Sequence, residues 1–284
     1  MLGAEEASPC RHAGAPTPSV IARVNAVIAQ LGDRKDLLEE FGLSPAEFQQ
    51  ALPAAIEASR GSRSAGQSNR RLFVRELLQQ LVQDGAIRDF VAPKPGEDTV
   101  YRLKIDGFDR DVGIIQKGCP DGAHSSKTMT VPEWAGETYL WWLCDSLANE
   151  PGEHVHKGVG RLQSGFFDEN ARKLAGVIFY NHLCGSLQRE CPKARRTLVI
   201  DGNPMPPPCI YVMPDWDGNA TAWNWNGLQE RAFPTILLRA FGVPEAEVPV
   251  FTGQIGFRHR PNSRRAAMNI TSRFGISRTT QHRS

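Results

Sequence analysis

The chain has 284 residues, of which 40% are hydrophobic and 23% charged, and its formal net charge is +2. These ordinary values exclude a disordered or fibrous chain. No apolar run approaches the roughly 20 residues that span a bilayer, and Glu5 and Glu6 stand where a secretory signal needs basic residues. We therefore expect a cytoplasmic protein without a membrane partner.

The N-terminal part of the sequence is predicted to be helical. Residues 1–18 are rich in Ala, Pro and Gly and are expected to be disordered. Residues 19–66 are expected to form a helical region, in which Ser44-Pro45-Ala46-Glu47 has the cap, proline and acid of a helix start. Residues 67–284 are expected to form one α/β domain that opens with an amphipathic helix over residues 70–83.

The hydrophobic period changes to two residues after Thr99. Alternation over residues 99–117, with a turn at Gly107 and Phe108, predicts a β-hairpin. Further elements are expected as a helix at 133–147, buried strands at 174–180, 197–200 and 209–213, and a helix at 233–241. The predicted fold is therefore α/β or α+β, with a mixed β-sheet flanked by helices.

The hairpin brings an acid and a cation to one end of a strand pair. With the turn centred near Gly107 and Phe108, Asp98 falls opposite Lys117. The carboxylate would bind Mg²⁺, and the ammonium would stabilise charge on a phosphodiester or orient the attacking water. Glu76, on the preceding helix, would give a second carboxylate. The alternative is that Asp98 and Lys117 form a surface ion pair.

Segments around this pair resemble type II restriction endonucleases of the PD-(D/E)xK superfamily. Residues 60–85 resemble the entry to the catalytic domain of these enzymes. Lys94-Pro95-Gly96-Glu97-Asp98 and Ile115-Gln116-Lys117 lie where the family has its metal-binding Asp and its (D/E)xK strand. The resemblance covers about residues 44–117. It implies a restriction-endonuclease-like fold and Mg²⁺-dependent, sequence-specific cutting of duplex DNA by a homodimer.

The sequence departs from the family pattern at two places. Two residues separate Pro95 from Asp98, and Ile115 stands where the second acid is expected. Glu76 or Gln116 would then have to take the place of that acid.

Positive charge is concentrated at the C-terminal end. No Asp or Glu follows Glu247, and the cations there are arginines. Apolar residues alternate over 254–257 and 267–276, which predicts basic strands rather than a solvated basic tail, the alternative. The guanidinium group forms bidentate hydrogen bonds with phosphate and with guanine, so we expect a surface for double-stranded DNA. The predicted DNA contacts are Arg60, Arg63, Arg258, Arg260, Arg264, Arg265 and Arg273.

Cysteine and histidine residues suggest a second kind of site. Six cysteines are too few for a disulfide scaffold in a chain of this length. A structural Zn²⁺ could be held by His182, Cys184, Cys191 and Cys209. Cysteines that pack as small hydrophobic residues are the alternative.

Two other functions are compatible with the sequence. The first is a non-catalytic DNA-binding protein, stabilised by zinc through the cysteines. The second is a metalloenzyme that acts on a small molecule through His154 and His156, which alternation on a strand would place on one face.

Overall fold

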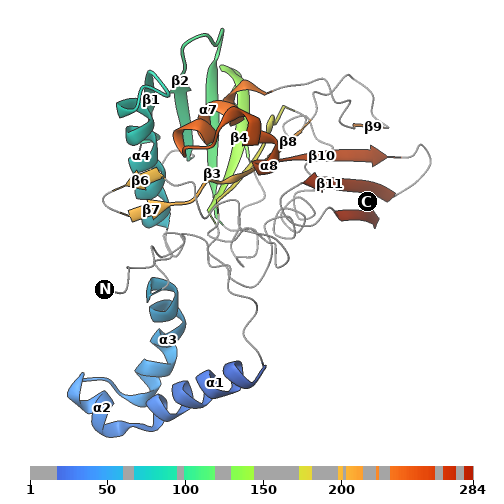
Figure 1. Ribbon diagram of the computed structural model, residues 1–284. Helices are drawn as coiled ribbons and strands as arrows, with labels where there is room; N and C mark the ends of the chain where they lie inside the picture. Colours follow the sequence, from blue (N-terminus) through green and yellow to red (C-terminus); the bar gives the residue numbers. More distant parts are fainter. Residues whose placement is uncertain are drawn as a thin grey trace, which may run out of the picture.

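The protein has a mixed α/β fold, with helices packed against a mixed β-sheet (Figure 1). The computed structural model describes residues 18–59, 67–94, 99–118, 129–143, 173–180, 198–200, 203–213, 222–223, 231–259, 265–272 and 278–283. The predicted mixed sheet with flanking helices is thereby confirmed. No helix within these ranges is long and apolar enough to cross a membrane.

The predicted N-terminal helices are present as α1 (Pro18–Asp33), α2 (Lys35–Glu40) and α3 (Pro45–Ser59), which pack with one another. The start of α3 is a reciprocal cap. The backbone N–H of Glu47 donates to Ser44 Oγ at 3.3 Å, and the backbone N–H of Ser44 donates to Glu47 Oε2 at 2.8 Å. This is the capping box that a Ser followed three residues later by Glu produces.

Within the described residues the large sheet has ten strands and contains both parallel and antiparallel pairs. Parallel pairing joins β3 to β4, β4 to β5, and β8 to β10, whereas the other neighbours are antiparallel. In spatial order the strands are β1 (Asp89–Val91), β2 (Val100–Lys104), β3 (Asp111–Lys117), β4 (Ala135–Leu143), β5 (Gly176–Tyr180), β8 (Cys209–Val212), β10 (Thr252–His259), β11 (Arg265–Ser272) and β12 (Arg278–Arg283). The short β9 (Ala222–Trp223) pairs with β10, and β6 (Leu198–Ile200) pairs with β7 (Asn203–Met205) in a second sheet.

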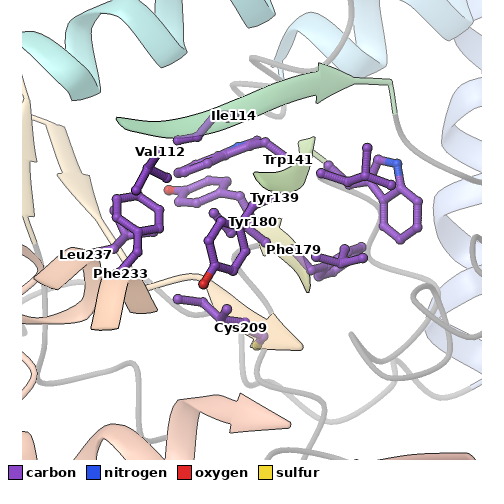
Figure 2. Packing of buried hydrophobic residues seen from close by; sticks show 14 of the residues in the cluster. Val112, Ile114, Tyr139, Trp141, Phe179, Tyr180, Cys209, Phe233 and Leu237 are labelled. Atoms are coloured by element: carbon purple, nitrogen blue, oxygen red, sulfur yellow. The ribbon is translucent and has the colours of Figure 1, made fainter. Parts of the chain in front are cut away.

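Two helices pack on the same face of the sheet. In α4 (Gln67–Gln83), the ring of Phe73 lies 5.0 Å from that of Tyr180. In α7 (Ala232–Ala240), the ring of Phe233 lies 5.3 Å from that of Tyr139. The register places Tyr139 and Tyr180 on one face, since paired residues share a face and alternate residues return to it. We call this side the helix face; Figure 2 shows its aromatic packing.

The predicted helix at 133–147 is wrong. Residues Ala135–Leu143 form β4, which lies between two parallel neighbours. All residues from Thr138 to Leu143 are buried, so the strand has no polar alternation. A continuous aromatic and aliphatic run of this kind is typical of a central strand covered on both faces, and it lacks a helical stripe.

The other predicted elements are found close to their expected positions, and several short elements were missed. Strands β5, β6 and β8 and helix α7 fall within the predicted ranges or start one residue before them. The elements without a prediction include β1, β7, the 3₁₀ helix η1 (Glu245–Glu247) and α8 (Val248–Phe251). Each has only three or four residues, too few to display a period.

Candidate functional site

The β2–β3 hairpin has the register that the sequence predicts. Val100 pairs with Ile115 and Leu103 with Val112. One step before the ladder, the backbone N–H of Gln116 donates to the carbonyl of Thr99 at 2.8 Å, and Thr99 Oγ1 donates to the carbonyl of Gln116 at 2.9 Å. The next position in this register is that of Lys117. Asp98, its predicted partner, lies outside the described residues.

Two buried polar side chains join this end of the hairpin to α4. The Tyr101 hydroxyl lies 3.2 Å from Gln116 Oε1 and 3.3 Å from the backbone carbonyl of Arg71. Tyr101 is 1% exposed and Gln116 3% exposed. Because both neighbouring oxygens are acceptors, the single hydroxyl proton lies between them. The contact connects the end of β3 to the first turns of α4.

Cations gather around the same end. A Cβ atom on Gly118 would lie 3.7 Å from Cζ of Arg70, and burial lowers the pKa of this guanidinium, which nevertheless stays protonated at neutral pH. Burial raises the pKa of the Tyr101 hydroxyl, and the charges of Arg71 and Arg75 oppose that rise. Nε of Arg71 is buried and has no hydrogen-bond partner within the described part of the chain. We call Arg70, Arg71 and Arg75, all on α4, the basic cluster.

Glu76 and Lys117 lie on opposite sides of the sheet. Gln116 is on the helix face, where it contacts Tyr101 below α4, and the adjacent Lys117 is therefore on the other face. Glu76 is on α4, half-buried and outside the stripe of fully buried residues that faces the sheet. It is also five residues beyond Arg71, about 7.5 Å along the helix axis. The structure does not bring these two predicted catalytic residues together.

The described residues contain no group of three His, Cys, Asp or Glu side chains that could hold a metal ion. Among the four predicted zinc ligands, only Cys209 falls within the described ranges. It starts β8, pairs with Phe179 and is 1% exposed within the hydrophobic core (Figure 2). This position is that of a cysteine packed as a small hydrophobic residue.

The predicted basic strands are present as β10 and β11, with Arg258 and Arg265 in their ladders. The sequence reasoning missed β12, which adds Arg278 and Arg283. Several predicted site residues lie outside the described part of the chain. They are Arg60, Arg63, Asp98, His154, His156, His182, Cys184, Cys191, Arg260, Arg264 and Arg273.

The sequence contained a signal for Arg70 that we did not use. Arg70 precedes the buried Phe73 and Leu77 by three and seven residues, and this spacing puts it on the sheet-facing stripe of α4. A cation on a buried stripe is uncommon, because it loses hydration without an apolar contact in return. No comparable signal exists for Tyr101 and Gln116, which alternate like the other inward residues of the hairpin.

Comparisons with known proteins add no relative: no family model, no curated protein and no solved structure matches the chain.

Proposed function

We propose that the protein hydrolyses phosphodiester bonds of double-stranded DNA in a Mg²⁺-dependent, sequence-specific reaction, as type II restriction endonucleases do. The observation that carries the proposal is the hairpin register. If the register continued by one residue beyond Thr99 and Gln116, it would pair the position of Asp98, which lies outside the described residues, with Lys117. The proposal includes a restriction-endonuclease-like fold and a homodimer that cuts both strands.

Asp98 and Lys117 have complementary roles in this reaction. Asp98 would hold Mg²⁺, which supplies a Lewis acid at the phosphate and lowers the pKa of a bound water. Lys117 would stabilise the negative charge that develops on the phosphate oxygens, or orient the water. The water oxygen forms a bond to phosphorus and the bond from phosphorus to one deoxyribose oxygen breaks. One water proton goes to that leaving oxygen and the other stays with the new phosphate group or passes to solvent.

Glu76 has a lesser role in the proposal than Asp98. It lies on the helix that covers the opposite face from Lys117, at a level further from the end of β3. A carboxylate there acts on the reacting phosphate only from a distance. We therefore assign metal binding first to Asp98.

The basic cluster supports a polyanionic substrate. Arg70 and Arg71 lie beside the last residues of β3, and Arg75 is exposed on the next turn of α4. Together with Lys117 they would make the end of the hairpin electropositive. Such a surface attracts the phosphate backbone of DNA and holds it without regard to sequence.

The test is incubation of the purified protein with plasmid and phage DNA in excess Mg²⁺ or in EDTA, followed by gel electrophoresis. Discrete bands that require Mg²⁺ are the expected result. Asp98→Asn and Lys117→Ala should abolish cutting while DNA binding in Ca²⁺ persists. Cutting by either variant at the wild-type rate would show that the site is wrong.

A second function is distinguished by the same experiment. A non-catalytic DNA-binding protein would shift the DNA bands in Mg²⁺ without producing fragments, and its affinity would fall steeply with salt. The zinc that this second function includes would be detected by metal analysis of the purified protein.

A further inference from the structure

The last three strands of the described chain form a ribbon at one end of the large sheet. β10, β11 and β12 pair antiparallel, and Figure 1 shows β10 and β11 extending from β8 away from α4. The pairs run from Gly253↔Ser272 to His259↔Ala266 between β10 and β11. Between β11 and β12 they start at Arg265↔Arg283. We call these strands the C-terminal ribbon.

One face of the C-terminal ribbon belongs to the hydrophobic core. Paired residues share a face, so Trp223, Phe257 and Met268 form one row across β9, β10 and β11. Ile255 and Ile270 form another row on the same face. These two isoleucines are 0% and 1% exposed. The part of this face around Ile255 and Ile270 is therefore packed. A ligand would have to approach the other face.

The other face has a different composition, and we call it the polar face. Its residues are all either small or able to form hydrogen bonds, and none is acidic. By register they are Ala222 of β9, Gln254, Gly256 and Arg258 of β10, Arg265, Ala267, Asn269 and Thr271 of β11, and Thr279, Gln281 and Arg283 of β12. Asn269 and Gln254 are half-buried, Thr271 is exposed and Gly256 is buried. Three arginines, two glutamines and an asparagine on one face give many donors and no negative charge.

These residue types match the edges of base pairs in the major groove of DNA. Arg pairs with guanine O6 and N7, and Asn or Gln pairs with adenine N6 and N7. The major groove, about 12 Å wide, admits a two-stranded β-ribbon, and neighbouring strands such as β11 and β12 lie about 4.8 Å apart. The row Ala222, Arg258, Ala267 sets small residues on both sides of one arginine, so the backbone can approach the groove closely.

We infer that the polar face of the C-terminal ribbon lies in the major groove of duplex DNA and reads base pairs there. The inference rests on the proposed function, because it takes duplex DNA as the substrate. It separates two tasks within the protein. The end of the β2–β3 hairpin would cut, and the C-terminal ribbon would select the sequence.

Arginines on the two faces provide a matched test. Arg265 and Arg283 pair with each other on the polar face, whereas Arg278 pairs with Ile270 and so belongs to the opposite face. Binding of the full-length protein is measured in Ca²⁺ on the phage DNA fragments it retains most tightly, with calf thymus DNA as competitor. Arg265→Ala and Arg283→Ala should each lower the preference for those fragments by about 5- to 150-fold, the fold-change that corresponds to 1–3 kcal/mol for one bidentate base contact. Arg278→Ala should leave the preference unchanged.

A change in the DNA instead of the protein tests the same contact between arginine and guanine. The retained fragments are prepared again with 7-deazaguanine, which removes the N7 acceptor from the major groove and leaves the minor groove intact. Wild-type affinity should fall, and Arg265→Ala should lose less than wild type. Thermal unfolding checks that each variant is folded. If Arg265→Ala unfolds, Gln281→Ala and the neighbouring Thr280→Ala, from opposite faces of β12, replace the arginine pair.

The outcomes separate this inference from the proposed function. Equal effects of the substitutions on the two faces, or indifference to 7-deazaguanine, would overturn the inference while Mg²⁺-dependent cutting could still be observed. Failure of the wild-type protein to bind DNA in any form would overturn both.

Discussion

The two ends of the β2–β3 hairpin carry similar residues in different surroundings. At the turn end, Lys104 Nζ lies 3.8 Å from a carboxylate oxygen of Asp89, and the Arg88 guanidinium lies 3.6 Å from Asp106. The side chains of these four residues are 37–81% exposed. Exposed ion pairs of this kind contribute about 0–1 kcal/mol to stability.

At the other end two polar side chains are buried. Tyr101 and Gln116 are almost inaccessible, and Arg70 is partly desolvated over the last residues of β3. Burial of a polar group costs free energy unless a hydrogen-bond partner compensates for the lost hydration. The comparison teaches that the same residue types have different surroundings at the two ends of the hairpin, because α4 packs on the end that holds Tyr101 and Gln116.

The largest difference between the ends is expected in catalysis. Lys117→Ala and Asp98→Asn should lower the rate of DNA cleavage by at least about 100-fold, as the loss of a charge-stabilising group does in other enzymes. Lys104→Ala and Asp106→Asn change the same residue types at the turn end. Each should leave the cleavage rate within about twofold of the wild-type rate. Initial rates on supercoiled plasmid measure all four. Equal losses at both ends would remove the distinction between them.

The next effect concerns stability at the buried end. Tyr101→Phe deletes the hydroxyl that Gln116 Oε1 and the Arg71 carbonyl share, and the buried Gln116 Oε1 loses this donor. We expect the free energy of unfolding to fall by about 1–3 kcal/mol. Tyr139→Phe provides a comparison, because it deletes a hydroxyl of another buried tyrosine, one that donates to Glu137 within the same strand. Urea denaturation followed by tryptophan fluorescence would show the difference, and an unchanged midpoint for Tyr101→Phe would contradict the role of this contact.

The contribution of Tyr101 to stability should also depend on pH in the alkaline range. Burial raises the pKa of Tyr101 in the folded protein above its usual value of about 10. The unfolded chain therefore loses this proton first as the pH rises, so the contribution to stability is complete below about pH 10 and is lost above it. The wild-type free energy of unfolding should fall more steeply above that pH than that of Tyr101→Phe. Parallel pH profiles of the wild-type protein and Tyr101→Phe would contradict a raised pKa of Tyr101.

A smaller effect is expected for Glu76. Because it lies on the opposite side of the sheet from Lys117, Glu76→Gln should reduce the cleavage rate by less than tenfold, or about 1.4 kcal/mol. The comparison with Asp98→Asn in the same plasmid assay decides whether α4 supplies a metal ligand. A loss as large as that of Asp98→Asn would place Glu76 at the reacting phosphate.

The smallest effect is expected for stability at the turn end. Lys104→Ala removes one exposed ion pair and should change the free energy of unfolding by less than about 0.5 kcal/mol. Urea denaturation provides the value. A change as large as that of Tyr101→Phe would mean that the turn end is held as tightly as the buried one.

Much of the local structure could be predicted from the sequence. Helical spacing predicted α1, α3, α4 and α7, and alternation predicted the hairpin with its register. These features depend on residues close in the chain, where a turn of fixed length sets the pairing. The strand β4 was mistaken for a helix because its burial comes from distant segments on both sides.

The sequence by itself determined which residues alternate, where the hairpin turns and in which register its two strands pair. Only the tertiary structure decided that Glu76 lies across the sheet from Lys117, that Tyr101 and Gln116 meet α4, and that β10 joins the sheet beside β8. The physical reason is the separation along the chain between the residues that interact. Backbone pairing across a short turn is fixed locally, whereas the choice of which face a helix covers depends on apolar surface contributed by segments far apart in the chain.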